Sequence, residues 1–212
     1  MTGPARVVLA TRNAGKVAEL RRILADHVEL VGIDEATPYE PGPETGATFA
    51  DNALAKAVEA VQATGLPAVA DDSGLAVDAL NGMPGVLSAR WSGRHGADAE
   101  NVALLLAQLA DVPDERRGGG FVCAAAFALP GGRSEVVQGE LRGQIARAAR
   151  GSGGFGYDPV LVPDGLDVTT AELSDAHKDA ISHRGEAFRL LAPRLLAALA
   201  SASAVRAEPA DG

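Results

Sequence analysis

The stretch Pro67-Ala68-Val69-Ala70-Asp71-Asp72-Ser73-Gly74-Leu75 carries two adjacent carboxylates directly after a short apolar run. Such a run is typical of a buried β-strand. We expect Asp71 and Asp72 where that strand ends, which is where ligands bind in open α/β sheets. Because adjacent residues of a strand point to opposite faces, the two acids are expected to have different roles. The sequence Asp-Asp-Ser-Gly also suits an ordinary surface turn.

Two carboxylates so close together suggest a nearby cation. Each raises the proton affinity of the other unless a positive charge lies between them. Carboxylate oxygens suit Mg²⁺, which usually takes one or two of them together with the phosphate oxygens of a substrate. The stretch therefore predicts a site where one of these acids holds a hard cation and the other faces a substrate or water.

The composition limits the class of protein. The chain has 212 residues, of which 47% are hydrophobic, enough for the core of one large domain or of two small lobes. A net charge of -9 argues against a surface that binds nucleic acid. The single cysteine, Cys123, cannot form a disulfide within the chain, which fits a reducing compartment. Since we find neither a membrane span nor a signal peptide, we expect a cytoplasmic protein.

The N-terminal part has the order strand, polar loop, helix. Residues 6–10 predict a strand, residues 11–16 a polar loop, and the apolar spacing of residues 17–24 a helix. This order presents backbone N–H groups to an anion, and Lys16 would add a positive charge. Taken alone, however, the segment is better explained as a solvated connection between a strand and a helix.

The next segment is irregular and leads into a helix. Residues 34–46 are rich in proline, glycine and glutamate, and Glu44 among them is expected to be solvent-exposed. Thr48 and Asp51 form a capping-box pattern that opens a helix to about Thr64. Asn52 and Lys56 share one face of that helix, which points either at a phosphate or, more simply, at water.

The middle of the chain indicates a mixed sheet. Residues 75–80 alternate like a strand, and Asp98 is expected to cap a helix through about Asp111. Residues 121–129 and 134–141, joined by Pro130-Gly131-Gly132-Arg133, are typical of an antiparallel hairpin, and 160–162 of a further strand.

Two later motifs are candidates for ligand binding. The glycines of residues 151–159 allow a ligand to approach the backbone, and an aromatic ring there can stack on a nucleobase, although a tight turn with buried rings is equally consistent. His183 and Arg184 stand near an expected helix start, where cations are unfavourable. Pro193 predicts a kink or break near Ala192.

Taken in order, these motifs resemble one known family. They are Thr-x-Asn-x-x-Lys from Thr11 to Lys16, Glu44-Thr45-Gly46, Asn52, Lys56, Ala70-Asp71-Asp72-Ser73-Gly74-Leu75, Gly154-Phe155-Gly156-Tyr157-Asp158-Pro159 and Ser182-His183-Arg184-Gly185. Each motif is modest, but the ordered set is similar to the inosine triphosphate pyrophosphatase family of non-standard purine nucleoside triphosphate pyrophosphatases. The resemblance spans nearly the whole chain.

The resemblance implies an α/β fold with a long mixed central sheet flanked by helices, and two lobes with an active-site cleft between them. Residues 1–202 would form this single two-lobed catalytic domain, and residues 203–212 a flexible tail. The implied activity is the Mg²⁺-dependent hydrolysis of ITP, dITP or XTP to the monophosphate and pyrophosphate by a homodimer, which keeps deaminated purines out of DNA and RNA.

The resemblance also implies roles for residues. Asp72 would be the proton acceptor and, with Glu44 and Asp71, a metal ligand. The substrate-binding residues would be Thr11, Arg12, Asn13, Ala14, Gly15, Lys16, Lys56, Ser73, Phe155, Gly156, Tyr157, Asp158, Lys178, His183 and Arg184. Two alternatives remain: a nucleotide-binding sensor without turnover, and an enzyme of the same class with a broader substrate range.

Overall fold

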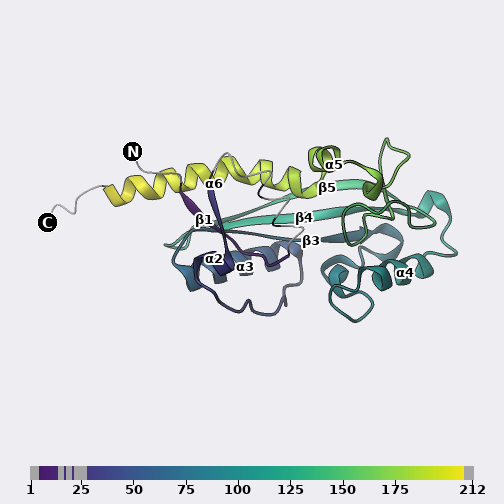
Figure 1. Ribbon diagram of the computed structural model, residues 1–212, viewed down its shortest axis with the longest axis horizontal. Coiled ribbons are helices and arrows are strands. Elements are labelled where there is room, and N and C mark those ends of the chain that lie inside the picture. The colour runs from purple at the N-terminus through teal and green to yellow at the C-terminus, as the bar shows by residue number, and fades with distance from the viewer. Residues whose placement is uncertain (1–4, 14–16, 18–20, 22–27, 208–212) are drawn as a thin grey trace.

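The computed structural model describes residues 5–13, 17, 21 and 28–207, and its centre is a six-stranded sheet (Figure 1). The strand order is β2-β1-β3-β4-β5-β6, with β1 parallel to both neighbours and the pairs from β3 to β6 antiparallel. The strands are β1 (Arg6–Leu9), β2 (Glu29–Gly32), β3 (Ala68–Val77), β4 (Gly118–Ala128), β5 (Ser134–Ile145) and β6 (Leu161–Pro163). The predicted mixed sheet is confirmed, whereas most of the helix predicted over 17–24 lies outside the described residues.

Strand β3 does not end at the two acids. It runs without interruption through Asp71 and Asp72 and stays paired with β4 from Ala68↔Ala128 to Val77↔Gly119. The predicted strand end and the alternative of a surface turn are therefore wrong. The strand predicted over 75–80 is confirmed for residues 75–77, which belong to β3, but residues 78–80 form a 3₁₀ helix. The continuous pairing with β4 satisfies the backbone of this segment, so its turn-like side chains do not break the strand.

Two helices cover the two faces of the sheet. Helix α6 (His183–Ala207) packs Phe188 and Leu195 on one face, in a cluster that includes Phe127 of β4. Helix α3 (Phe49–Thr64) packs on the other face through small residues, with Ala53, Ala57 and Ala60 in one cluster with alanines of β3 and β4. Figure 1 shows α6 above and α3 below the strands. Small side chains allow α3 to lie close to β3.

A third cluster lies at the other end of β3. Leu75 and Val77 pack there with Leu105 of helix α4 (Asp98–Gln108) and with Leu161 of β6. Figure 1 shows α4 at the opposite end of the molecule from α2 (Ile33–Ala36). The acids of β3 thus lie between residues 68–70, which pack at one end, and residues 75–77, which pack at the other. This arrangement gives the fold two halves that share β3, β4 and β5.

The local signals at helix ends have mixed outcomes. Thr48 caps α3, its Oγ1 accepts from the N–H of Asp51, and the capping box is confirmed. The stretch 34–46, predicted irregular, begins inside the short helix α2. Asp98 does not cap α4, because Ala97 holds the N-cap position and the Asp98 carboxylate accepts a hydrogen bond from elsewhere. Helix α5 (Asp175–Ile181) carries Lys178.

Helix α6 runs unbroken through Pro193, so the predicted break is wrong. Ala192 and Leu195 are buried against the sheet on either side of the proline, and this packing compensates for the missing backbone hydrogen bond. The helix continues to Ala207, which places residues 203–207 of the predicted tail in helix. In the part of the chain that the structure describes, no helix is both long and apolar enough to cross a membrane.

Candidate active site

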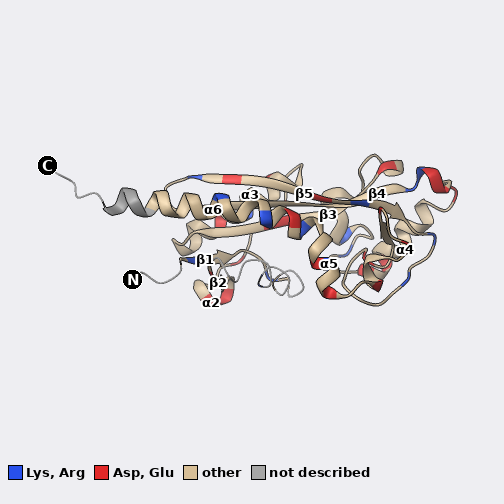
Figure 2. Cartoon of the chain, turned by 90° about the horizontal axis from the view of Figure 1, so that it is seen from above, with Lys and Arg blue, Asp and Glu red and all other residues tan. Residues whose placement is uncertain are grey.

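Acidic and basic residues occur together in both halves of the molecule (Figure 2), so surface charge alone does not mark a site. The buried charges do. Asp71 is 1% exposed and Asp72 is 7% exposed. Oδ2 of Asp72 accepts a hydrogen bond of 2.9 Å from Nδ2 of Asn52 in α3, whereas Oδ2 of Asp71 lies 3.2 Å from Nε of Arg184 in α6. The prediction that the two acids face opposite sides of the strand is confirmed.

Lys56 joins Asp72 to a second carboxylate. Its Nζ donates to Oδ1 of Asp72 at 3.2 Å and to Oε1 of Glu44 at 2.9 Å. Burial by itself lowers the pKa of the Lys56 ammonium, but the charges of Asp72, Asp71 and Glu44 raise this pKa above its usual value. The expectation that Asn52 and Lys56 face water is wrong, and Glu44, with 29% of its side chain exposed, is only partly open to solvent.

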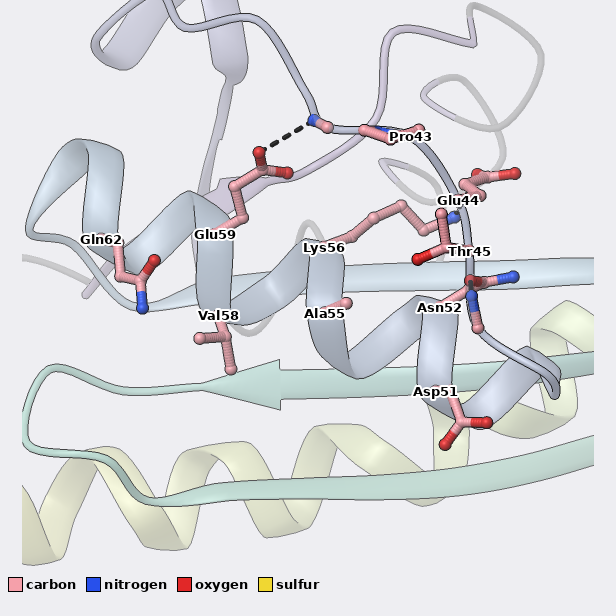
Figure 3. A pocket seen from close by; sticks show the side chains of 12 residues that line it. Pro43, Glu44, Thr45, Asp51, Asn52, Ala55, Lys56, Val58, Glu59 and Gln62 are labelled. Carbon is pink, nitrogen blue, oxygen red and sulfur yellow. Dashed lines mark hydrogen bonds and ion pairs between the residues drawn. The ribbon is translucent and has the colours of Figure 1, made fainter.

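The segment before α3 is held against that helix. The N–H of Gly46 donates to Oδ1 of Asn52, and the N–H of Gly42 donates to Oε1 of Glu59, each at 2.8 Å (Figure 3). A Cβ at Gly46 would lie 2.6 Å from Oδ1 of Asn52, so only glycine fits there. Asn52 therefore holds both the segment and Asp72.

Arg90 reaches the same segment from the other half of the molecule. It lies in the 3₁₀ helix Gly85–Arg90 that follows β3. Its Nη2 donates to the carbonyl oxygen of Glu44 at 3.4 Å, and its Nη1 lies 3.6 Å from Oε2 of that side chain. Glu44 thus lies between two cations, Lys56 and Arg90.

A pocket of about 540 Å³ opens between this segment and α3 (Figure 3), within the usual size range of small-molecule sites. Its lining residues are Gly42, Pro43, Glu44, Thr45, Gly46, Asp51, Asn52, Ala55, Lys56, Val58, Glu59 and Gln62. Since Glu44, Asn52 and Lys56 line the pocket and also contact one another or Asp72, the pocket adjoins the candidate active site.

On the other face of β3, Asp71, Ser73 and Arg184 form a closed group. Nη2 of Arg184 donates to Oγ of Ser73 at 2.8 Å, and this hydroxyl donates to Oδ2 of Asp71 at 3.2 Å. Sγ of Cys123 in β4 lies 3.9 Å from the same carboxylate oxygen. The Arg184 side chain is 3% exposed, so the expected base-contacting arginine is also a buried ion-pair partner.

The glycine-rich loop presents an aromatic ring. Phe155 is 38% exposed, and its ring centroid lies 5.2 Å from Nζ of Lys178 and 5.8 Å from Cζ of Arg184. The buried carboxylate of Asp158 fixes the loop, because it accepts from the N–H of Phe155, from Lys178 and from Oγ1 of Thr170. Lys178 and Arg184, which are distant from the loop in sequence, thus lie beside its exposed ring.

Two further bonds tie this loop to its neighbours. The N–H of Gly156 donates to Oδ2 of Asp98 at 2.8 Å, and the Tyr157 hydroxyl donates to the carbonyl oxygen of Ser88 at 3.0 Å. Burial, with a smaller effect of the Asp98 charge, raises the pKa of the Tyr157 phenol. Tyr157 therefore anchors the loop in the core instead of offering a ring to a ligand.

The remaining predicted residues lie at two places. The ring of His183 stacks on Phe121 of β4 with 4.9 Å between centroids. In the N-terminal loop, the N–H of Asn13 donates to Oγ1 of Thr11. Arg12 pairs with Glu40 at 3.0 Å. Ala14, Gly15 and Lys16 lie outside the described residues.

The predicted site residues do not include four that the structure brings to this site: Asn52, Ser88, Arg90 and Asp98. Asn52 nevertheless belongs to the motifs that carry the resemblance, and the sequence offers Arg90 as either a phosphate ligand or an ion-paired arginine, of which the structure shows the ion pair. The i, i+4 spacing of Asn52 and Lys56 was a usable signal. The other three contact residues that are far away in the sequence, and their own local patterns indicate a loop or a helix cap.

The chemistry of the donors fits a hard cation. Among the described residues, no three His, Cys, Asp or Glu side chains form a metal-ligating group. Glu44 and Asp72 nevertheless converge on one cation, the ammonium of Lys56. A pair of carboxylates is the protein share of a typical Mg²⁺ site, in which substrate phosphates and water supply the other ligands. These residues therefore fit Mg²⁺ bound together with a phosphate compound.

The comparison with known proteins gives one consistent family. A family model described as the Ham1 family matches residues 7–194. A dITP/XTP pyrophosphatase of Nocardia farcinica is 66% identical over 197 residues, which cover 91% of this chain and 96% of that protein. A protein of the same name from Streptomyces coelicolor is 61% identical over 193 residues, 89% of this chain and 96% of that protein.

Solved structures agree with the sequence comparison. The crystal structure of a nucleoside-triphosphatase / dITP/XTP pyrophosphatase from Mycobacterium abscessus is 60% identical with a TM-score of 0.75, and the match covers 89% of this chain and 99% of that one. A HAM1 protein from Coxiella burnetii is 40% identical with a TM-score of 0.83, over 90% of this chain and 98% of that one.

Proposed function

The chain belongs to the Ham1 family, and from this premise we infer that it is a nucleoside triphosphate pyrophosphatase. It hydrolyses non-standard purine nucleoside triphosphates of the dITP and XTP kind to the monophosphate and pyrophosphate. The structural observation that best supports this function is the group of Glu44, Lys56 and Asp72. There, the Lys56 ammonium contacts both carboxylates beside a pocket.

We propose that Asp72 accepts a proton from the water that attacks the α-phosphorus. Proton transfer needs a carboxylate within hydrogen-bond reach of the water, and the donors Asn52 and Lys56 keep Asp72 ionised and oriented. Attack at this phosphorus releases pyrophosphate as the leaving group. The roles of the individual residues are supported by their contacts and by the family resemblance of their motifs.

Mg²⁺ is the cofactor that we propose. When bound with a substrate, it neutralises phosphate charge and stabilises the leaving pyrophosphate. Asp72 and Glu44 would hold it, while Lys56 would add its positive charge to the triphosphate. Asp71 is the third metal ligand that the resemblance implies, but its ion pair with Arg184 on the other face of β3 argues against it.

The loop at Phe155 is the proposed base site. Its exposed ring offers a stacking surface, and Lys178 and Arg184 lie beside it. His183, which precedes Arg184 in the chain, is the third residue that we propose for this site. A donor directed at the purine 6-position accepts the 6-oxo group of hypoxanthine or xanthine but opposes the 6-amino group of adenine. Such a mismatched buried pair lowers affinity by about 1–3 kcal/mol.

As the resemblance implies, Thr11, Arg12, Asn13, Ala14, Gly15, Lys16, Lys56 and Ser73 would bind the phosphates and the sugar. We further propose a homodimer that acts on the nucleotide pool of the cytoplasm, as the family resemblance implies. A net charge of -9 is consistent with a small-molecule substrate instead of a nucleic acid.

Product analysis with ITP, XTP, GTP and ATP, each with and without Mg²⁺, tests the function. We expect monophosphate and pyrophosphate, formed from ITP and XTP in preference to GTP and ATP, and only with Mg²⁺. Diphosphate and phosphate as products would contradict attack at the α-phosphorus. Tight ITP binding without turnover would instead identify a sensor, and equal turnover of all four would identify a broad-range enzyme.

A further inference from the structure

The carboxylate of Asp71 is the most enclosed charge of the candidate site. Its side chain is 0% exposed, and that of its partner Arg184 is 3% exposed. Two buried charges are tolerated only when they are well paired and hydrogen-bonded, since each loses its hydration. Here Ser73 adds a second contact to each partner, because its hydroxyl accepts from Arg184 and donates to Oδ2 of Asp71. Asp71 therefore belongs to a rigid polar group that holds an arginine.

The partners of Asp71 differ from those of its neighbour. Arg184 comes from α6, and Cys123 belongs to the apolar cluster on the α6 side of the sheet. The candidate metal carboxylates, Asp72 and Glu44, share the ammonium of Lys56 from α3, which covers the opposite face. The alternation of a continuous strand thus separates Asp71 from them.

The arginine that Asp71 holds is next to the aromatic ring of the loop. Cζ of Arg184 lies 5.8 Å from the ring centroid of Phe155. Guanidinium groups are planar, and contacts at Nε and Nη2 together fix both the position and the rotation of that plane. A donor whose orientation is fixed in advance discriminates between acceptor and donor groups on a base better than a mobile one does.

We propose that Asp71 is a positioning residue for purine recognition: it fixes the guanidinium of Arg184 at the base site and so sets the preference for 6-oxopurines. This proposal rests on the proposed function. It gives the two adjacent acids of β3 separate tasks, because Asp72 acts on the phosphate side while Asp71 acts through Arg184 on the base side. Because Asp71 and Asp72 are adjacent in β3, the peptide bond between them fixes the position of one carboxylate relative to the other.

The first experiment compares the wild-type chain with Asp71→Asn in kcat and KM for ITP and ATP and in the Mg²⁺ concentration that gives half-maximal rate. We expect the ITP-to-ATP ratio of kcat/KM to fall about tenfold or more, and the Mg²⁺ requirement to change by less than about twofold. Asp78→Asn is the matched control, since Asp78 forms an exposed ion pair with Arg142. It is expected to leave both quantities unchanged.

A rise of several-fold in the Mg²⁺ requirement with an unchanged base preference would overturn the proposal and support a metal role for Asp71. An equal loss of turnover with ITP and ATP in a folded variant would overturn it as well. The wild-type ratio is measured first, so a wild-type chain without preference for ITP would refute the proposed function and not the positioning role alone.

A second variant guards against misfolding, because Asp71→Asn leaves Arg184 buried without its carboxylate. The double variant Asp71→Asn/Arg184→Gln removes both charges, and we expect thermal unfolding to show it more stable than Asp71→Asn. If Asp71 acts through Arg184, the double variant has the same ITP-to-ATP ratio as Arg184→Gln. The proposal would be overturned if Asp71→Asn lowered the ITP-to-ATP ratio by the same factor whether residue 184 is arginine or glutamine.

Discussion

Nζ of Lys56 lies 3.2 Å from Oδ1 of Asp72, and the same nitrogen lies 2.9 Å from Oε1 of Glu44. A single ammonium from α3 therefore contacts two acids that come from different parts of the chain. In a triphosphate hydrolase, this arrangement holds both carboxylates close together before a substrate arrives. The first predictions concern these three residues.

Asp72→Asn should abolish hydrolysis while the fold and nucleotide binding remain. The amide has nearly the shape of the carboxylate but cannot accept a proton from water, so we expect kcat for ITP to fall at least about a hundredfold. Steady-state kinetics and calorimetric ITP binding measure the two effects, with the exposed Asp164→Asn as control. Near-normal turnover would remove Asp72 from the role of base.

Lys56→Gln should destabilise the protein. It leaves Glu44 and Asp72 near each other without the cation between them, and we expect the free energy of unfolding to drop by about 1–3 kcal/mol. Urea denaturation at neutral pH measures this change. Unchanged stability would show that solvent already screens the group.

The raised pKa of Lys56 also predicts a pH dependence. Because its pKa in the folded protein is above the ordinary 10.5, its stabilisation is complete below pH 10.5 and disappears as pH rises through the folded-state value. As the pH is raised above 10.5, the wild-type chain should therefore lose more stability than Lys56→Gln, and denaturation at each pH measures this difference. Parallel losses in the two proteins would contradict this assignment.

Arg90→Gln should weaken substrate binding. From the other half of the molecule, the Arg90 guanidinium contacts both the side-chain carboxylate and the carbonyl oxygen of Glu44. Without this contact, we expect KM for ITP to rise several-fold with kcat little changed. Arg94→Gln is the control, because Arg94 is 75% exposed and pairs with Glu100. An equal rise of KM in both variants would show that the loss of any positive charge weakens binding, and that the contact with Glu44 is not the cause.

Gly74→Ala should destabilise the fold. A Cβ at Gly74 would overlap Oγ of Ser88 and lie 2.6 Å from the carbonyl oxygen of Gly85, so we expect a loss of about 1–3 kcal/mol. Gly32→Ala, where the nearest atom is 3.6 Å away, is the control. Thermal unfolding compares the two. Equal midpoints would mean that the 3₁₀ helix after β3 moves aside without strain.

The parts of the fold that the sequence predicted well have local signals. The capping box at Thr48 and the glycine after Thr64 define α3, and the turn at 130–133 defines the hairpin of β4 and β5. Strand β3 was mispredicted because Asp-Asp-Ser-Gly is turn-like. What keeps it a strand is pairing with Cys123 and Ala124 of β4, distant in the sequence.

The site was predictable as a set of residues but not as an arrangement. The motifs named Asp71 and Arg184 together, yet nothing local shows that residues 113 positions apart form a buried ion pair. Similarly, Asp98 has the local sequence of a helix cap, and only the folded chain brings its carboxylate to the N–H of Gly156. Pairings of this kind depend on tertiary structure.

The position of Arg184 in the last helix has a consequence for synthesis. A ribosome makes β3 long before α6, so a nascent chain holds Asp71 in a forming apolar core without the cation that it needs. A product of premature termination, ending before residue 184, keeps that uncompensated charge permanently and is a natural target for proteolysis. We therefore expect chains that end before α6 to be degraded more readily than chains that include it.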